Sequence, residues 1–317
     1  MSEGTAVRNI QTTSAAGEDS LGQHKSVKTL RAEASAADRH TIFRVFWYGG
    51  NILLIFAIVV AAYSGAWEYS TRRYLRGFSD AIVPESSSTE QKIEAILQWM
   101  SHGPARQEMD PPVPGPDRNP TDTLNYASLL RVCGSATNAF VNLADSAGLP
   151  ARRLLLLDSH RMTKHVVAEV FVDGRWIVVD PAFRTVLRGP DGQLLTREQL
   201  ANPAIFAAAT RGIADYDPAY TFDRTAHVRI ARLRVIGVSI RSILDRGLPG
   251  WEDSAAVSLM LERESLAILV IALILVVLLG LLRVGLRWYG ESRLGVRPVR
   301  FRQQVRRAFH AFVDTAG

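Results

Sequence analysis

Two long apolar runs interrupt the chain, one in its first quarter and one toward its C-terminal end. Residues 45–63 (VFWYGGNILLIFAIVVAAY) and 266–282 (LAILVIALILVVLLGLL) contain no charged side chain. Each run is close to the length that crosses a bilayer as a helix, whereas buried core helices are seldom apolar on every side for so long. We therefore predict transmembrane helices over 45–64 and 266–282. The first run follows a polar leader, too far along the chain for a cleavable signal peptide, so we expect a retained anchor.

The segment between the runs, 65–265, has the periodicities of a folded domain with both helices and strands. Apolar residues recur at helical spacing, and the helices have typical starts and stops. Ser88 and Thr196 are suitable N-caps, and Gly148-Leu149-Pro150 ends a helix. The pattern predicts helices over 88–101, 134–147 and 251–265, a further helix start at Thr196, a strand over 153–157 and a hairpin over 165–183.

Three segments lack such a pattern. Residues 1–40 are rich in small polar and charged side chains, and we expect the leader, 1–44, to be disordered. Residues 104–120 contain six prolines, which predicts a long loop. Residues 225–246 mix arginines with Val and Ile, and the pattern assigns them no element.

The hairpin HVVAEVFVDGRWIVVDPAF carries a histidine at its start and an aspartate near its end. If Asp173-Gly174 is a two-residue turn, Val172 pairs with Arg175 and the register of both strands follows. His165 and Asp180 then become diagonal neighbours on one face, within reach of each other. A carboxylate there fixes the tautomer of the ring and leaves its other nitrogen free to act as a base. The opposite face of the hairpin is apolar and faces a core: it consists of Val166, Ala168, Val170, Ile177 and Val179.

Cys133 is the only cysteine, so the chain forms no internal disulfide. It stands where the helix over 134–147 begins, and the helix dipole and the N–H groups of the first turn favour a thiolate there. The same N–H groups, including that of Gly134, are placed to bind an oxyanion. Cysteine, histidine and aspartate in this order are the activated nucleophile of acyl-transfer chemistry. The alternative is a packed, inert thiol.

Two stretches of the chain together resemble the transglutaminase-like superfamily of papain-related enzymes. They are CGSATNAFVNLADSAGLPAR and HVVAEVFVDGRWIVVDP. The shared features are a cysteine that opens a helix, a Gly-Leu-Pro-Ala-Arg stop, a histidine strand, a Gly-Arg-Trp turn and an Asp-Pro. The resemblance covers 120–185 closely and 90–205 loosely. It implies an α+β, papain-like domain in which the cysteine helix packs on an antiparallel sheet. It also implies Cys133 as nucleophile, His165 as general base and acid, and Asp180 as the residue that orients the histidine.

The charges outside the apolar runs predict the topology. Residues 283–317 hold eight Arg against two acids, and five basic residues precede the first run within twenty positions. The middle, 45–282, holds 23 basic and 24 acidic residues, so the excess charge belongs to the two ends. By the positive-inside rule both termini are cytoplasmic, and the domain over 65–265 is periplasmic. The high pI then reflects membrane topology, and no nucleic-acid partner is expected.

Three arginines after the first span bear on the topology prediction, and the role of the basic tail has two interpretations. Arg72, Arg73 and Arg76 lie on the outer side of the first span and weaken the topology prediction. The tail over 283–317 is most simply a contact for anionic lipid, and a cytoplasmic protein partner is the alternative. The ratio of arginine to lysine, with only four lysines, together with the topology, indicates a bacterial inner-membrane protein.

Three other residues near the motifs have simpler interpretations. Trp176 shares the His165 face of the hairpin, and we expect packing or at most a supporting role. Glu169 also shares that face, farther along the strand, where an arginine partner is expected. His160 lies in a polar stretch and is expected in a solvated loop.

These observations predict a membrane-anchored cysteine hydrolase, amidase, peptidase or acyltransferase that acts on envelope peptides or proteins through a thioester. Its chemistry requires no metal or organic cofactor. The alternative, from another class, is an inactive domain of the same fold that serves as an envelope binding or assembly module and contacts other membrane proteins.

Overall fold

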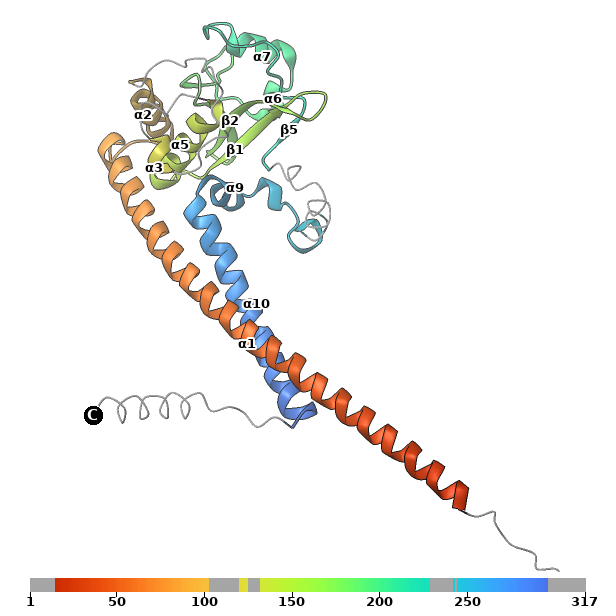
Figure 1. The fold of residues 1–317 in the computed structure, drawn as a ribbon. Coiled ribbons are helices and arrows are strands. Elements are labelled where there is room, and N and C mark those ends of the chain that lie inside the picture. Colours follow the sequence, from red (N-terminus) through yellow and green to blue (C-terminus); the bar gives the residue numbers. More distant parts are fainter. Residues whose placement is uncertain (1–14, 103–119, 125–131, 229–241, 243, 296–317) are drawn as a thin grey trace, which may run out of the picture. The chain divides into compact units, whose positions relative to one another are not determined.

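The computed structural model describes residues 15–102, 120–124, 132–228, 242 and 244–295 (Figure 1). The chain divides into two compact units, one of residues 1–58 with 273–317 and one of residues 59–272. The second unit contains the sheet and the predicted site residues, and it is described first. Apart from Pro120, the proline-rich segment predicted to be a loop lies outside the described residues.

An antiparallel sheet organises the second unit, with strand order β4-β3-β2-β1-β5. The predicted hairpin is confirmed, and Val172 pairs with Arg175 across the turn as expected. The strand predicted over 153–157 is also confirmed, two residues longer at its start. The strands are β1 (Ala151–Leu157), β2 (Thr163–Val172), β3 (Arg175–Asp180), β4 (Thr185–Val186) and β5 (Thr225–Ala226).

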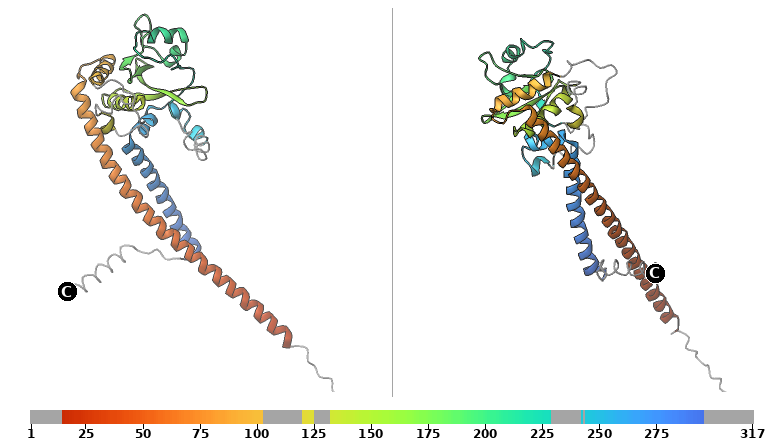
Figure 2. Two further views of the ribbon diagram at one scale, coloured as in Figure 1. Left: turned by 45° about the horizontal axis from the view of Figure 1, so that its top comes forward. Right: turned by 90° about the vertical axis from the view of Figure 1, so that its left-hand side faces the viewer.

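Helix α5 (Cys133–Ser146) packs on one face of this sheet, and α6 (Arg197–Leu200) and α7 (Pro203–Thr210) cover the other (Figure 1; Figure 2). The face toward α5 is the predicted apolar one, and Ala168, Val170, Ile177 and Val179 are completely buried there. The opposite face, which includes the His165 side of β2, carries a second core around Val167, Val178 and residues of α6 and α7. The sheet is therefore buried on both faces.

Two of the smaller helices begin as their sequences predict. Helix α2 (Thr89–Ser101) starts with a capping box between Ser88 and Gln91, and its apolar stripe is buried in the core with α5. Helix α6 starts with the same device between Thr196 and Gln199. The short α3 (Pro120–Thr123) contacts α5.

The N-terminal leader differs from the prediction. It was expected to be disordered over 1–44. Residues 1–14 lie outside the described residues, and from Ala15 the chain forms helix α1, which runs to Ile82 as a single element. No proline occurs between these residues, and the leader is rich in Ala, Leu, Lys, Arg and Glu, which have high helix propensity. The apolar run over 45–63 is therefore only part of a longer helix.

The C-terminal helices are interrupted where one helix was predicted. Residues 251–265 form a 3₁₀ turn η2 (Trp251–Asp253), then α9 (Ala255–Glu262), and then the start of α10 (Glu264–Arg293). The break lies at Arg263, whose backbone is extended with φ −130° and ψ 102°. Helix α10 extends past both ends of the predicted span over 266–282. The tail from 296 onward lies outside the described residues.

Two helices, Arg39–Ile82 and Glu264–Arg293, are long and apolar enough to cross a membrane, judged by length and composition. In each, 11% of the most apolar window is buried within the protein. In the first unit, parts of these two helices contact each other. The Phe43 ring lies so close to Gly290 that a Cβ there would be 2.7 Å from it, and the Arg283 guanidinium lies 5.8 Å from the centre of the Trp47 ring. A side chain larger than that of glycine therefore does not fit at position 290 without a shift.

In the second unit, the break at Arg263 places a buried charge against α5. The Arg263 side chain is 1% exposed and donates hydrogen bonds to Asn142 Oδ1 at 3.0 Å, Glu68 Oε1 at 3.0 Å and Asp145 Oδ2 at 3.2 Å. Ser265 donates to the other oxygen of Glu68 at 2.7 Å. Both oxygens of the Glu68 carboxylate on α1 therefore accept hydrogen bonds from residues at the junction of α9 and α10.

The preceding residue, Glu262, connects the same break to α5 and β1. Its carboxylate lies 2.7 Å from Arg153 Nη2 and accepts from Asn138 at 3.1 Å. Its carbonyl also accepts from Asn138 and, at 3.4 Å, from Asn142. Positions 138, 142 and 145 are one turn apart along α5, so they form a polar stripe that faces the α9–α10 junction.

We predict that Arg263→Ala lowers the free energy of unfolding by about 3 to 5 kcal/mol, because it leaves the buried Glu68 carboxylate without its buried charged partner. Arg72 also contacts Glu68, at 2.7 Å, but its side chain is 61% exposed. Arg72→Ala is therefore the matched control and should cost less than about 1 kcal/mol. Thermal unfolding of the full chain in detergent micelles, followed by tryptophan fluorescence, measures both. Equal effects of the two substitutions would contradict the role assigned to Arg263.

Candidate active site

His165 and Asp180 form a completely buried pair at the ends of β2 and β3. His165 Nε2 lies 2.7 Å from Asp180 Oδ2, and neither side chain is exposed to solvent. The other carboxylate oxygen, Oδ1, accepts from the backbone N–H groups of Ala182 at 3.1 Å and Phe183 at 3.4 Å. The carboxylate is therefore held from two sides, and it fixes one nitrogen of the ring.

The turn at Asp173-Gly174 explains why these two residues meet. Both have positive φ, 46° and 84°, as two-residue hairpin turns with the twist of a β-ribbon require. The turn sets the register of β2 against β3, and a shift by one residue would move every side chain to the other face. The hairpin thus buries the valines and places His165 beside Asp180 in one arrangement, as the sequence predicted.

Cys133 is the first residue of α5 and is half-buried. Its thiol is near enough to His165 to form a hydrogen-bonding and charge interaction with the ring. His165 Nδ1 is completely buried. Because Asp180 occupies Nε2, Nδ1 is the nitrogen that remains to exchange a proton with Cys133.

The first turn of α5 supplies backbone N–H groups beside the thiol. The N–H groups of Ser135 and Ala136 donate to the Val132 carbonyl, so the helical ladder begins there. The N–H of Gly134 precedes that ladder, in the part of a helix that has no helical acceptor. Gly134 is buried, and its carbonyl accepts from Arg153 Nη2 at 3.2 Å, which holds this turn in place.

The environment of His165 favours its charged form. Burial lowers the pKa of the ring, but the hydrogen bonds and charges of Asp180 and Cys133 raise it more, to about 9. The imidazolium is therefore present below about pH 9 and is lost as the pH rises through that value. An imidazolium between a carboxylate and a thiol stabilises the thiolate.

An aromatic cover over His165 was missed by the sequence analysis. The Tyr220 ring stacks on the imidazole with a centroid distance of 4.2 Å and an angle of 6° between the planes. Phe183 and Tyr216 meet the imidazole edge-on at 5.8 and 6.2 Å, and Tyr216 donates a hydrogen bond to Asp180 Oδ2 at 3.0 Å. Phe183 lies within the motif, whereas no local pattern around 216–220 indicates contact with residue 165.

The other predicted residues lie away from the dyad or in supporting positions. Trp176 is on the His165 face near the turn, where the Arg152 guanidinium lies 4.0 Å from the centre of its ring. Glu169 pairs with an arginine as expected, because Arg152 Nε lies 2.7 Å from its carboxylate, and it also contacts His227 at 2.7 Å. His160 is exposed in a loop, as expected. Trp176 thus has a packing role.

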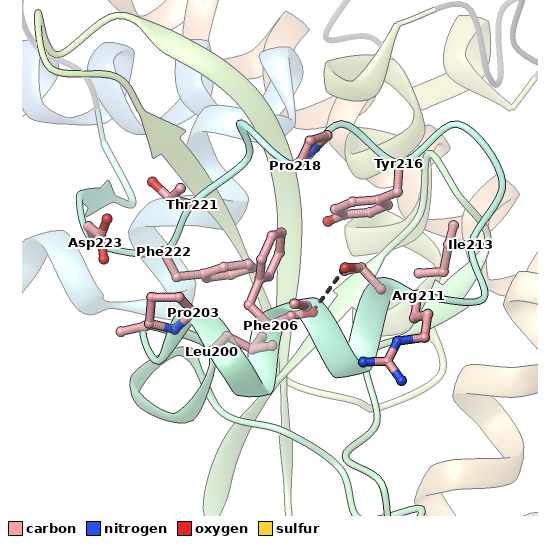
Figure 3. A pocket seen from close by; sticks show the side chains of 13 residues that line it. Leu200, Pro203, Phe206, Arg211, Ile213, Tyr216, Pro218, Thr221, Phe222 and Asp223 are labelled. Carbon is pink, nitrogen blue, oxygen red and sulfur yellow. Dashed lines mark hydrogen bonds between the residues drawn. The ribbon is translucent and has the colours of Figure 1, made fainter.

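A pocket of about 470 Å³ lies beside the aromatic cover, between α7 and the segment that follows it (Figure 3). Phe206 and Phe222 line it, and the Tyr216 ring extends toward it from that segment. Tyr216 therefore has one side on the pocket and its hydroxyl on Asp180.

The comparisons with known proteins identify the domain. Residues 76–181 match the family model of the Transglutaminase-like superfamily, and this matched region includes Cys133, His165 and Asp180. The match and the observed cysteine helix on an antiparallel sheet confirm the predicted resemblance and the α+β fold class. Neither the curated proteins nor the solved structures gave a match.

We predict that Cys133 is alkylated by iodoacetamide as a thiolate at neutral pH, because the His165 imidazolium persists to about pH 9. An ordinary cysteine titrates near about 8.5, so the rate should reach its plateau well below that value. Since Cys133 is the only cysteine, the modified mass of the full chain measures this site alone. His165→Ala should move the profile to higher pH, and His160→Ala, in the exposed loop, should not. Identical profiles for wild type and His165→Ala would disprove the coupling.

Proposed function

The chain contains a transglutaminase-like domain, and we propose that this domain is a cysteine enzyme acting on amide bonds of envelope peptides or proteins. The observation that supports this most directly is the buried His165–Asp180 pair, with Cys133 beside the ring at the start of α5. We propose Cys133 as nucleophile, His165 as general base and acid, and Asp180 as the residue that orients His165.

In the proposed reaction, the Cys133 thiolate attacks the carbonyl carbon of the amide and forms a tetrahedral oxyanion. The N–H of Gly134 and the positive end of the α5 dipole stabilise that charge. The imidazolium of His165 gives its proton to the amide nitrogen, the C–N bond breaks, and an amine leaves. The acyl group remains on Cys133 as a thioester. Neutral His165 then takes a proton from water or from a second amine, which attacks the thioester and releases Cys133. Water gives hydrolysis, and an amine gives transfer or a crosslink.

The aromatic residues on α1 support a membrane anchor. Trp47 and Trp67 lie twenty residues apart, about 30 Å along a helix, which matches the hydrocarbon thickness of a bilayer. Aromatic rings at both boundaries of a span are typical of membrane helices. The large apolar side chains between them, such as Ile52, Ile55 and Phe56, are more than half exposed, unlike those of a core helix. We propose that the chain is anchored in the inner membrane by α1 and α10, with both termini cytoplasmic and the domain periplasmic.

An inactive binding or assembly module is the second candidate. The observation that favours it is the complete burial of His165 under Tyr220, because a sealed histidine can serve packing alone. The half-buried thiol of Cys133 favours the enzyme, since a nucleophile must be reached by its substrate.

We predict that Cys133→Ala abolishes turnover, and that His165→Ala lowers kcat/KM at least about 100-fold, because it removes proton transfer. The measurement uses the full chain in lipid vesicles with glutamine-containing peptides and a fluorescent primary amine, so that mass spectrometry detects both hydrolysis and amine transfer. The matched control is His160→Ala, which should retain full activity. If Cys133→Ala folds normally and retains the biological function of the chain, the enzyme proposal fails and the binding module stands.

The topology is tested with two single-cysteine variants, one in the loop after β1 and one near the end of α10, each in a Cys133→Ala background. Ser159 is exposed in the loop after β1, and Ser292 is exposed near the end of α10. We predict that Ser159→Cys is labelled in intact spheroplasts by a membrane-impermeant maleimide, and that Ser292→Cys is labelled only after permeabilisation. Equal labelling of both before permeabilisation would contradict the proposed anchoring.

A further inference from the structure

We propose that Tyr216 and Tyr220, which follow α7, are positioning residues of this site: Tyr216 holds the Asp180 carboxylate, and Tyr220 holds the plane of the His165 ring. The inference rests on the proposed function for its catalytic meaning, and on the geometry for the positions themselves. Both tyrosines lie beyond the region, 76–181, that matches the family model. They come from the part of the chain that follows the matched region and packs onto it through the aromatic contacts around His165.

Tyr216 completes the set of donors around Asp180. Its hydroxyl donates to Oδ2 at 3.0 Å, the same oxygen that His165 Nε2 contacts at 2.7 Å. Burial raises the pKa of Tyr216, and the negative charge of Asp180 raises it further, so the hydroxyl keeps its proton throughout the working pH range. With the two backbone donors on Oδ1, the carboxylate has partners on both oxygens and cannot rotate without losing hydrogen bonds.

Tyr220 restrains the other member of the pair. Its ring is parallel to the imidazole, with 6° between the planes and 4.2 Å between centroids. A protonated imidazole is attracted to the face of an aromatic ring, so this contact favours the imidazolium and limits rotation of the ring. The Tyr216 ring meets Tyr220 edge-on at 5.6 Å, which connects the two tyrosines.

A turn and aromatic contacts fix the position of the segment that carries the two tyrosines. Asp215, directly before Tyr216, has φ 57°, a left-handed conformation that an aspartate adopts more readily than most residues. The Tyr216 ring lies near Phe206 of α7 (Figure 3), with 5.9 Å between the ring centroids. It also contacts Phe183, with 4.6 Å between the centroids. The position of Tyr216 is thus fixed from three sides: the turn, the aromatic contacts and the hydrogen bond to Asp180.

The test measures the pH at which His165 loses its proton, through the alkylation profile of Cys133 in the full chain in detergent micelles. Tyr216→Phe removes one donor from Asp180, concentrates negative charge on the oxygen that faces His165, and should move the loss of the imidazolium to higher pH. Tyr220→Leu removes the aromatic face and should move it to lower pH. Each shift is expected to be on the order of one pH unit. A role in packing alone predicts no shifts of opposite sign.

Controls separate positioning from folding. Tyr220→Phe keeps the ring and should restore the wild-type profile, and Tyr69→Phe, an exposed tyrosine on α1, should not change it. If Tyr220→Leu does not fold, Tyr216→Phe, which removes a single oxygen atom, decides the proposal. Unchanged profiles for Tyr216→Phe and Tyr220→Leu would overturn it.

Turnover in the same variants distinguishes this proposal from the proposed function. Tyr216→Phe should lower kcat about tenfold, as the loss of one buried hydrogen bond implies, and leave KM unchanged because Tyr216 contacts Asp180. Shifted alkylation profiles in a protein without turnover would refute the enzyme and retain the positioning role. Turnover with unshifted alkylation profiles would support the enzyme and refute the positioning role of the tyrosines.

Discussion

Helix α5 is buried along eleven consecutive positions, 134–144, so every polar side chain on it must find its partner inside the protein. Four of these residues are polar. The Ser135 hydroxyl bonds to the neighbouring Val132 carbonyl, and the other three have partners from distant parts of the chain. Thr137 donates to the carbonyl of Val166 on β2, Asn138 contacts Thr123 and Glu262, and Asn142 contacts Arg263. Elements before and after α5 therefore have to converge on it. The helix that carries Cys133 at its start is in this way held on all sides.

The second requirement is the register of the β2–β3 hairpin, which a two-residue turn sets. In that register the residues of one face enter the core with α5, and the residues of the other face meet a second core under α6 and α7. His165 and Asp180 lie at the open end of the hairpin on this second face. Their contact is thus a consequence of the same turn that buries the strands, and the geometry of the pair cannot change independently of the core.

Local features were predictable from the sequence, whereas features that depend on distant contacts were not. The Asp173-Gly174 turn and the Ser88 cap are decided within a few residues, and both appear as predicted. The break at Arg263 was missed because 251–265 is apolar enough for one helix, and the break depends on partners as remote as Glu68. Tyr216 was missed because a hydrogen bond across 36 positions has no local signature. The helix in the leader was missed because a polar and charged composition is typical of disordered segments, although the same Ala, Lys, Arg and Glu residues also have high helix propensity.

The charges at the site explain why a buried carboxylate needs so many donors. With Cys133 as thiolate and His165 as imidazolium, the proposed triad carries two negative charges and one positive charge. The surplus negative charge lies in a region of low dielectric, where an uncompensated charge is costly. Three neutral donors, the Tyr216 hydroxyl and two backbone N–H groups, all contact Asp180 and spread part of that charge. They allow His165 to remain charged for Cys133 without giving its proton to Asp180, and the ion pair beside the helix dipole can then persist in a site closed to water on the Asp180 side.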